Sequence, residues 1–336
     1  MREEILKVNN LKTYFNLSTG VAKAVDGVSF TLKKGEILGI VGESGSGKSV
    51  TVSSIMRLLP KPIGKIADGE IIFEGKDLAK ISEKEMLKIR GKDITMIFQD
   101  PMTSLDPVFT IGHQIIEVIR VHQKISKAEA SKVAIEALAM VGIPEAEKRM
   151  NSYPHEFSGG MRQRVIIAMA IVSKPKIIIA DEPTTALDVT VQAQVLDLLK
   201  DLQKKLDTSI ILITHNLGVV WNMCETIMVM YAGKTVEYAT TKVLYTNPLH
   251  PYTQGLLNSI PKLSDSSDKP LETIPGTPPD LRLTGKGCNF HNRCKFAKEI
   301  CKNKIPELQE IEEDHFVACH FQKKGGNLVE IKGGGE

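Results

Sequence analysis

Alternating apolar and polar positions predict short strands in the first part of the chain. Residues 5–8 and 25–32 follow this alternation, and both lead into an apolar run at residues 36–41. We expect antiparallel strands followed by one buried strand. Residues 66–77 predict a hairpin that turns at Asp68 and Gly69, with a second turn at residues 74–75.

The spacing changes to helical in the middle of the chain. Ile111, Ile115 and Ile119 lie on one face of a predicted helix, and residues 110–150 are mostly helical. Ser126 with Glu129 is typical of a capping box at the start of a second helix. This segment therefore predicts a helical insertion between strands, and a further helix opens with glycines after Ser158.

A fully apolar run returns at residues 177–180 and ends in two carboxylates, which predicts a buried parallel strand, and residues 209–215 are predicted to form the next buried strand. A helix is expected between them, from Val189 to about Leu206. Residues 227–230 and 233–237 are predicted to close the sheet. After about residue 246 prolines recur, and the pattern predicts a linker or meandering extension that ends in a cluster of cysteines.

One stretch carries the clearest chemistry. It fits the pattern G-x-x-x-x-G-K-[ST], follows an apolar strand and precedes a helical pattern, as a phosphate-binding loop requires. Its glycines allow successive N–H groups to point at a phosphate, and the helix adds its positive end. Its lysine would reach the β and γ phosphates and its last serine would hold Mg²⁺. The alternative interpretation, a flexible Gly/Ser loop without a ligand, is disfavoured by the strand before the loop and the helix after it. The residues are Gly42, Glu43, Ser44, Gly45, Ser46, Gly47, Lys48 and Ser49.

Polar residues at the ends of later strands complete a candidate catalytic set. Asp181 can hold Mg²⁺ through a water, and Glu182 can polarise the attacking water as a general base. Gln99 can ligate Mg²⁺, and both Gln99 and His215 can contact the γ-phosphate. Alone, each would be read as an ordinary polar residue at a strand end. Their order after a phosphate loop favours catalysis.

Composition excludes several classes of protein. The chain has 336 residues, with 43 Lys and Arg against 40 Asp and Glu, and these charges are too dispersed for a nucleic-acid binder. It has no run of 18 apolar residues and no apolar segment of a secretory signal at its start. Without such a signal, the four clustered cysteines suggest metal before disulfides, whereas Cys224 stands alone.

In order and spacing these motifs, together with Ser158–Met161 and Ala186–Asp188, resemble the ATP-binding-cassette ATPases over about residues 5–245. One departure is Phe157 and Met161, where the commonest form is Leu-Ser-Gly-Gly-Gln; the serine and glycines remain. The resemblance implies an α/β fold with a RecA-like phosphate-loop core and an inserted helical subdomain. It places an antiparallel β subdomain and the loop in residues 1–98, the helical subdomain in 99–165, the rest of the core in 166–246 and a cysteine-rich extension in 247–336.

Further segments resemble, more narrowly, the ATPase subunits of dipeptide and oligopeptide importers. These segments are residues 24–28, 97–101, 153–155, 180–189 and 250–253, together with the cysteine tail. Such cassettes dimerise head to tail, with a sister subunit or a second copy, on two membrane permease subunits at the cytoplasmic face. A solute-binding protein takes part indirectly. The same motifs occur in importers of other solutes such as nickel. A non-transport cassette is disfavoured because long heptad arms and a second cassette are both missing from the sequence.

By position, the resemblance also implies roles for single residues. Phe15, or Tyr14 beside it, would stack on adenine, and Asp188 would link the two sites of the dimer. Gln99 with the helical insertion would touch the permease. The remaining nucleotide contacts would come from Val50 beside the loop and, on the partner cassette, from Ser158, Gly159 and Gly160.

The cysteine tail has the spacing C-x5-C-x6-C-x17-C and lacks the C-x2-C pairs of many zinc sites. Four thiolates can hold a [4Fe–4S] cluster or zinc, and four ordinary thiols are the remaining interpretation. Importer ATPases with this tail are associated with a [4Fe–4S] cluster, which we therefore favour. His291, His315 or His320 can replace one cysteine in a zinc site. The cysteines are Cys288, Cys294, Cys301 and Cys319.

Overall fold

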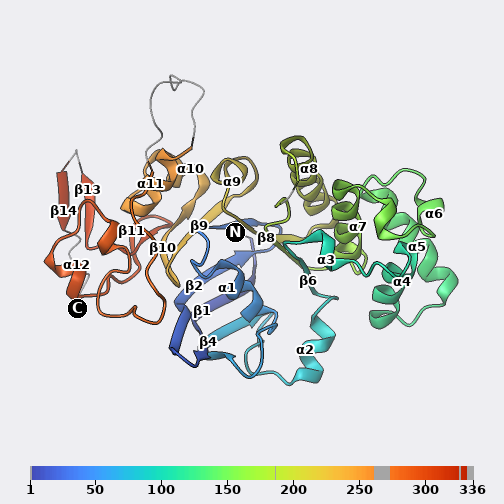
Figure 1. Cartoon of the computed structure of the whole chain (residues 1–336), viewed down its shortest axis with the longest axis horizontal. Helices are drawn as coiled ribbons and strands as arrows, with labels where there is room; N and C mark the ends of the chain where they lie inside the picture. Colours follow the sequence, from blue (N-terminus) through green and yellow to red (C-terminus); the bar gives the residue numbers. More distant parts are fainter. Residues whose placement is uncertain (1, 186, 261–272, 325–326, 331–336) are drawn as a thin grey trace. The chain divides into compact units, whose positions relative to one another are not determined.

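The computed structural model describes residues 2–185, 187–260, 273–324 and 327–330 (Figure 1). The chain divides into two compact units. The first contains Met1–Glu3, Leu32–Ile37 and Lys80–Ile213, and the second contains Glu4–Thr31, Leu38–Ala79 and Thr214–Glu336. No helix in the described part of the chain is both long and apolar enough to cross a membrane.

Three parallel strands form the sheet of the first unit, in the order β6 (Ile94–Ile97), β7 (Ile177–Asp181) and β8 (Ser209–Thr214). Every residue of β7 and β8 is buried. Strands buried on both faces consist of nearly continuous apolar runs, which is why residues 177–180 and 210–213 lack alternation. The two predicted buried strands are confirmed.

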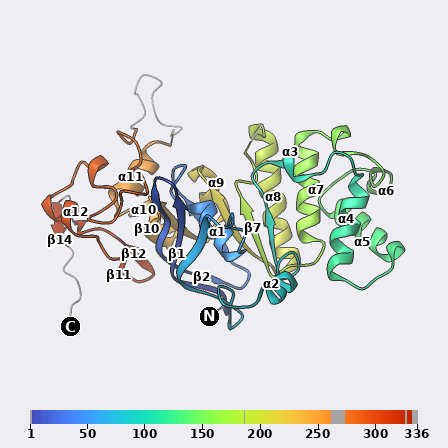
Figure 2. The ribbon, with the colours of Figure 1, turned by 60° about the horizontal axis from the view of Figure 1, so that its bottom comes forward.

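Helices make up the rest of the first unit. Ser126 and Glu129 close the predicted capping box at the start of α5. Helices α4, α5 and α7 pack on one another and lie side by side in Figures 1 and 2. The elements are α2 (Glu83–Ile89), α3 (Pro101–Ser104), α4 (Ile111–His122), α5 (Lys127–Met140), α6 (Ala146–Arg149), the 3-10 turn η1 (Pro154–Glu156), α7 (Gly159–Ile171) and α8 (Val189–Leu206).

A four-stranded sheet in the second unit has the order β2 (Gly20–Lys33), β1 (Glu4–Leu17), β4 (Gly64–Phe73) and β5 (Lys76–Asp77). The hairpin predicted at Asp68 and Gly69 is wrong, because β4 runs unbroken through these residues. β1 is long enough to pair along all of β4, and Gly69 lies at a bulge in that ladder. Its φ of 96° suits glycine, and a Cβ there would lie 2.5 Å from the Asn10 carbonyl oxygen.

The second unit also holds five strands in the order β11 (Gln309–Glu312), β12 (His315–Val317), β10 (Lys234–Thr240), β9 (Thr226–Tyr231) and β3 (Ile37–Val41). The sequence predicted only a meandering extension after residue 246. Instead, β12 pairs antiparallel with β10 and extends its sheet. The remaining elements are α1 (Lys48–Ile55), α9 (Leu217–Met223), α10 (Thr241–Thr246), α11 (Pro251–Asn258), the 3-10 turn η2 (His291–Arg293), α12 (Glu299–Asn303), β13 (Phe321–Lys324) and β14 (Asn327–Glu330).

One buried carboxylate anchors the extension to β10. Glu237 is fully buried and accepts hydrogen bonds from the backbone N–H groups of Leu249 (2.8 Å) and His250 (3.0 Å). Its other contact is Nε2 of His315 on β12, at 2.8 Å. A buried carboxylate needs such partners to offset its lost hydration. The Glu237 side chain thereby fixes both the start of α11 and strand β12, which lies about 80 positions later in the chain, to β10.

Acidification should weaken this region through His250. Burial lowers the pKa of His250 to about 4, and its Nδ1 accepts the Tyr252 N–H at 3.0 Å. The unfolded chain has an ordinary histidine pKa of about 6.5 and so binds more protons between pH 6.5 and 4. Stability falls as pH falls through that window, by at most on the order of 3 kcal/mol from this group.

Urea unfolding at pH 7.5 and pH 5 measures the loss. The control variant His250→Asn can still cap α11 through its side-chain oxygen but does not titrate. Its stability should therefore depend less on pH than that of the wild-type chain. An equal pH dependence in the two proteins would show that His250 does not contribute.

Candidate functional site

The predicted phosphate loop connects β3 to α1 in the second unit. Gly42, Gly45 and Gly47 have φ angles of 151°, 76° and 104°. A Cβ on Gly42 would lie 2.2 Å from the Met230 carbonyl oxygen, and one on Gly47 would lie 2.3 Å from that of Ala24. Both the backbone angles and the close approach of neighbouring strands therefore require glycine.

Lys48 begins α1, where its buried side chain curls back over the loop. Its ammonium donates to the carbonyl oxygens of Gly42 (2.8 Å) and Glu43 (3.0 Å). The Ser46 hydroxyl is buried and has no hydrogen-bond partner among the described residues. Ser49, predicted to hold Mg²⁺, is exposed. An ammonium, an unpaired buried hydroxyl and a helix N-terminus suit a bound phosphate.

The two candidate adenine-stacking residues lie on opposite faces of β1. The Thr13 hydroxyl is 2.7 Å from that of Ser54 on α1, so Thr13 and Phe15 share the face toward α1, beside which β1 lies (Figure 2). Tyr14 points the other way and donates its hydroxyl to Asp26 at 2.7 Å. Burial, followed by that hydrogen bond, raises the pKa of Tyr14 to about 12. Phe15 is the aromatic residue on the side of the loop helix.

In the first unit, the predicted base Glu182 and the predicted Mg²⁺ ligand Gln99 meet at the end of β7. Gln99 donates to the Glu182 carboxylate at 3.1 Å, and the Thr185 hydroxyl donates to the same oxygen at 3.0 Å. Glu182 has a φ of 47°, a conformation uncommon outside glycine and one that occurs at functional sites. Asp181 ends the strand and is buried. His215 is exposed directly after β8, and it belongs to the second unit.

The serine–glycine motif caps helix α7. Ser158 accepts the Met161 N–H at 3.4 Å and, with Gly159, is exposed. A Cβ on Gly160 would lie 2.7 Å from Cγ1 of Val191 on α8. The structure therefore brings Asp188, which caps α8 through Val191, near this motif. Ala186 of the Ala186–Asp188 motif lies outside the described residues.

The four clustered cysteines line one cavity of about 20 Å³ together with His291 and His320. None forms a disulfide. His315 is not among the lining residues and bonds to Glu237 instead. Burial raises the pKa of Cys288 to about 12 and that of Cys319 to about 11. As they stand, no three His, Cys, Asp or Glu side chains in the described ranges are arranged to hold a metal ion.

Sequence reasoning missed three residues beside the loop. Tyr252 accepts the Glu43 N–H at 2.8 Å, and Arg293 pairs with the Glu43 carboxylate and contacts Tyr231. A His-Pro-Tyr-Thr sequence at residues 250–253 entered the family resemblance but suggested no contact with the loop. The two pairings with Glu43 join positions more than 200 residues apart, which no local pattern marks.

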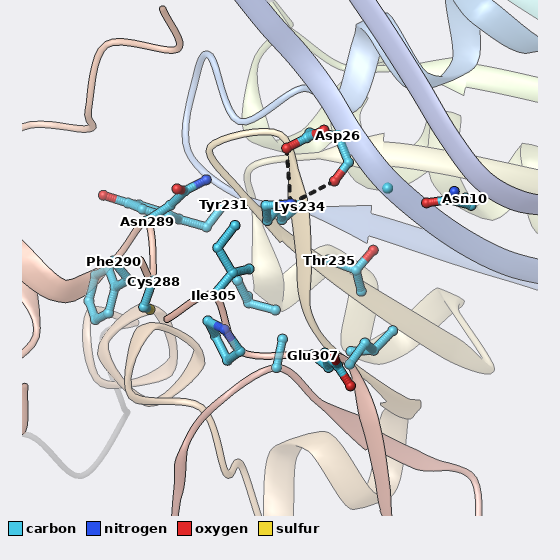
Figure 3. A pocket seen from close by; sticks show the side chains of 15 residues that line it. Asn10, Asp26, Tyr231, Lys234, Thr235, Cys288, Asn289, Phe290, Ile305 and Glu307 are labelled. Carbon is cyan, nitrogen blue, oxygen red and sulfur yellow. Dashed lines mark hydrogen bonds and ion pairs between the residues drawn. The ribbon is translucent and has the colours of Figure 1, made fainter. Parts of the chain in front are cut away.

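Tyr231 also lines a larger cavity of about 240 Å³ (Figure 3). Its wall includes Cys288 and Phe290 from the extension and an ion pair of 3.0 Å between Lys234 and Asp26. The cavity shows that the cysteine segment, β10 and Tyr231 are packed around a common space.

Comparison with known proteins places these features in a family. A sequence model described as ABC transporter matches residues 25–185, and one described as oligopeptide/dipeptide transporter, C-terminal region, matches residues 236–301. The dimeric post-hydrolysis structure of the ATP-binding cassette MJ0796 has a TM-score of 0.63 and 29% identity, over 70% of this chain and 98% of that one. CbiO1 from Clostridium perfringens has a TM-score of 0.63 and 31% identity, over 73% and 91%.

Two Bacillus subtilis proteins are similar over nearly the whole chain. The dipeptide transport ATP-binding protein DppD is 50% identical over 98% of both chains. The oligopeptide transport ATP-binding protein OppD is 56% identical over 93% of this chain and 87% of its own length. The chain thus combines this sequence identity with the phosphate loop, the Glu182 site and the capped helix α7 described above. The chain therefore belongs to the ABC transporter family, among its oligopeptide and dipeptide transport ATP-binding proteins.

Proposed function

We propose that this chain is the ATP-hydrolysing subunit that powers import of dipeptides or oligopeptides through a membrane permease, bound at the cytoplasmic face. The observation that carries the proposal is the built phosphate loop in a chain that also matches the oligopeptide/dipeptide C-terminal region at residues 236–301. Relatives named for peptides favour peptide import over nickel or a non-transport role.

ATP binding begins at residues 42–49. Their N–H groups and Lys48 surround the β and γ phosphates, and the unpaired Ser46 hydroxyl gains a partner. Ser49, Gln99 and Asp181 are the residues that would hold Mg²⁺. The ion neutralises charge on the phosphates when it is bound. Val50 follows the loop in α1 and completes the contact set.

Hydrolysis then depends on Glu182 as the base that polarises water. Its contacts with Gln99 and Thr185 hold the carboxylate in one orientation. A positioned general base typically contributes 10²–10⁴-fold. His215 contacts the γ-phosphate in this scheme.

A second cassette completes each site. Ser158, Gly159 and Gly160 at the N-terminus of α7 cover the γ-phosphate held by the partner's loop, and Asp188 links the two sites. The partner is a sister ATPase or a second copy of this chain. ATP closes the dimer and hydrolysis reopens it, which moves two permease subunits through Gln99 and the helices after it. A solute-binding protein delivers the peptide.

A reconstituted transporter tests the proposal. Purified chain, sister ATPase and permease in liposomes should hydrolyse ATP faster when the solute-binding protein and peptide are added. Hydrolysis that responds to nickel but not to peptide would contradict peptide import.

Adenine recognition gives a prediction at β1. Phe15→Ala should raise the Kd for MgATP about tenfold, since base–aromatic stacking contributes about 1–3 kcal/mol. Tyr14→Ala should have less effect on affinity, because Tyr14 faces Asp26. Titration with a fluorescent ATP analogue measures both. A larger loss in the Tyr14 variant would assign stacking to Tyr14.

We further propose that Cys288, Cys294, Cys301 and Cys319 bind a metal centre, a [4Fe–4S] cluster in preference to zinc. Four thiols free of disulfides line one cavity, which suits both groups chemically. Burial raises the pKa of Cys288 and Cys319, so the protonated thiols are favoured until a cation stabilises the thiolates. The centre is structural in this proposal.

Metal analysis of anaerobically purified protein should find iron and acid-labile sulfide in equal amounts. Cys301→Ser should lose most of both. Cys224→Ser is the matched control, because Cys224 is buried elsewhere and lies outside this cavity. Zinc without sulfide would contradict the cluster and indicate a zinc site. Absence of iron, sulfide and zinc would indicate four ordinary thiols.

A further inference from the structure

Arg293 of the cysteine-rich extension is bound on every side. Its side chain is 5% exposed, and it lies in η2, next to Cys294. A guanidinium has five N–H donors, and each has an acceptor here. The acceptors are Glu43 Oε2 (2.6 Å), Glu43 Oε1 (2.9 Å), Pro275 O (2.8 Å), Ile274 O (3.3 Å) and the Tyr231 hydroxyl (3.3 Å).

The principal partner of Arg293 is the second residue of the phosphate loop. Glu43 receives a bidentate pair, the strongest arrangement between guanidinium and carboxylate. Its N–H donates to Tyr252, and its carbonyl accepts from Lys48 and from the Ser46 N–H at 3.2 Å. Each polar group of Glu43 is therefore held. Two of the residues that hold it, Tyr252 and Arg293, lie after position 250.

These contacts bear directly on Lys48. The ammonium that must reach the phosphates rests on the Glu43 carbonyl, and Arg293 and Tyr252 hold the carboxylate and the N–H of that same residue. Glu43 has no evident attraction for ATP, because its negative charge opposes a phosphate. Glu43 therefore contributes to the loop through its contacts with Arg293 and Tyr252, which fix its position.

We infer that Arg293 is a positioning residue for nucleotide binding, by which the extension keeps the phosphate loop in its binding shape. This inference rests on the proposed ATPase function. It adds a specific link between residues 274–293 and the nucleotide site, and the link requires no particular occupant of the cysteine cavity.

The variant Glu43→Gln separates positioning from simple charge. Loss of a negative charge near the phosphates should strengthen ATP binding if charge alone matters. Loss of the bidentate pair should weaken it if Arg293 positions the loop. We expect the Kd for MgATP to rise about fivefold in Glu43→Gln and about tenfold in Arg293→Met. Arg293→Lys, which keeps the charge and part of the bonding, should fall between Arg293→Met and the wild-type chain.

The double variant Glu43→Gln/Arg293→Met should bind no more weakly than Arg293→Met, since both changes break one interaction. Arg282→Met is the control: Arg282 lies in the same extension and pairs with Asp280. All are titrated with fluorescent MgADP and MgATP analogues, and their melting without nucleotide identifies unfolded protein.

If folded Glu43→Gln and Arg293→Lys bind nucleotide within twofold of wild type, or if Glu43→Gln binds more tightly, the inference is overturned. A wild-type chain that binds no ATP would instead reject the proposed function. The two failures are therefore distinguishable.

Discussion

Glu182→Gln should hydrolyse MgATP at least about 100-fold more slowly than the wild-type chain while still binding it. The amide matches the carboxylate in size and keeps an oxygen for Gln99 and Thr185, which hold it at 3.1 and 3.0 Å. It cannot accept a proton from water at neutral pH. Chemistry is therefore lost and binding is spared, so the ATP-bound dimer should accumulate.

Phosphate release and gel filtration with MgATP measure these two effects. Glu147→Gln is a matched control, because Glu147 is an exposed acid on α6 of the same unit. It should retain wild-type turnover. Near-normal hydrolysis by Glu182→Gln would remove Glu182 from the role of base.

Lys48→Met should raise the Kd for MgATP by about 100-fold. Lys48 is 5% exposed and is the residue whose ammonium would leave the Gly42 and Glu43 carbonyls for the phosphates. Two charge-assisted hydrogen bonds of about 1.5 kcal/mol each correspond to this loss. Methionine fills a similar volume without charge, so packing around α1 changes little.

Binding of a fluorescent ATP analogue measures the effect, and thermal melting checks that the chain is folded. Lys76→Met on β5 is the control for removal of one lysine charge, because Lys76 is exposed. Affinity within threefold of wild type in Lys48→Met would contradict the assignment of residues 42–49 as the phosphate site.

Local sequence patterns predicted the fully buried strands and the helix cap correctly. The apolar runs became β7 and β8, and Ser126 caps α5 as expected. The turn at Asp68 and Gly69 failed because a positive φ serves a bulge as well as a hairpin, and only the length of β1 decides between them. The strands β11 and β12 depend on an edge of β10 that sequence spacing does not reveal.

Some residues of the candidate site could likewise be predicted from local motifs, and others could not. Residues 42–49 and Glu182 follow from contiguous motifs, whereas Arg293 and Tyr252 reach Glu43 across about 250 and 209 positions. Tyr14 and Phe15 are chemically interchangeable in the sequence, and the contacts of Thr13 with Ser54 and of Tyr14 with Asp26 tell which face each occupies. Long-range partners and strand faces are properties of the folded chain.

Uptake of a labelled oligopeptide tests most directly whether ATP hydrolysis by this chain powers peptide import. Cells that lack this chain but keep its permease, sister ATPase and solute-binding protein are supplied with the wild-type chain or with Glu182→Gln. Wild type should restore uptake, and Glu182→Gln, at equal abundance, should not. Full uptake without the chain, or equal uptake with both forms, would contradict this role.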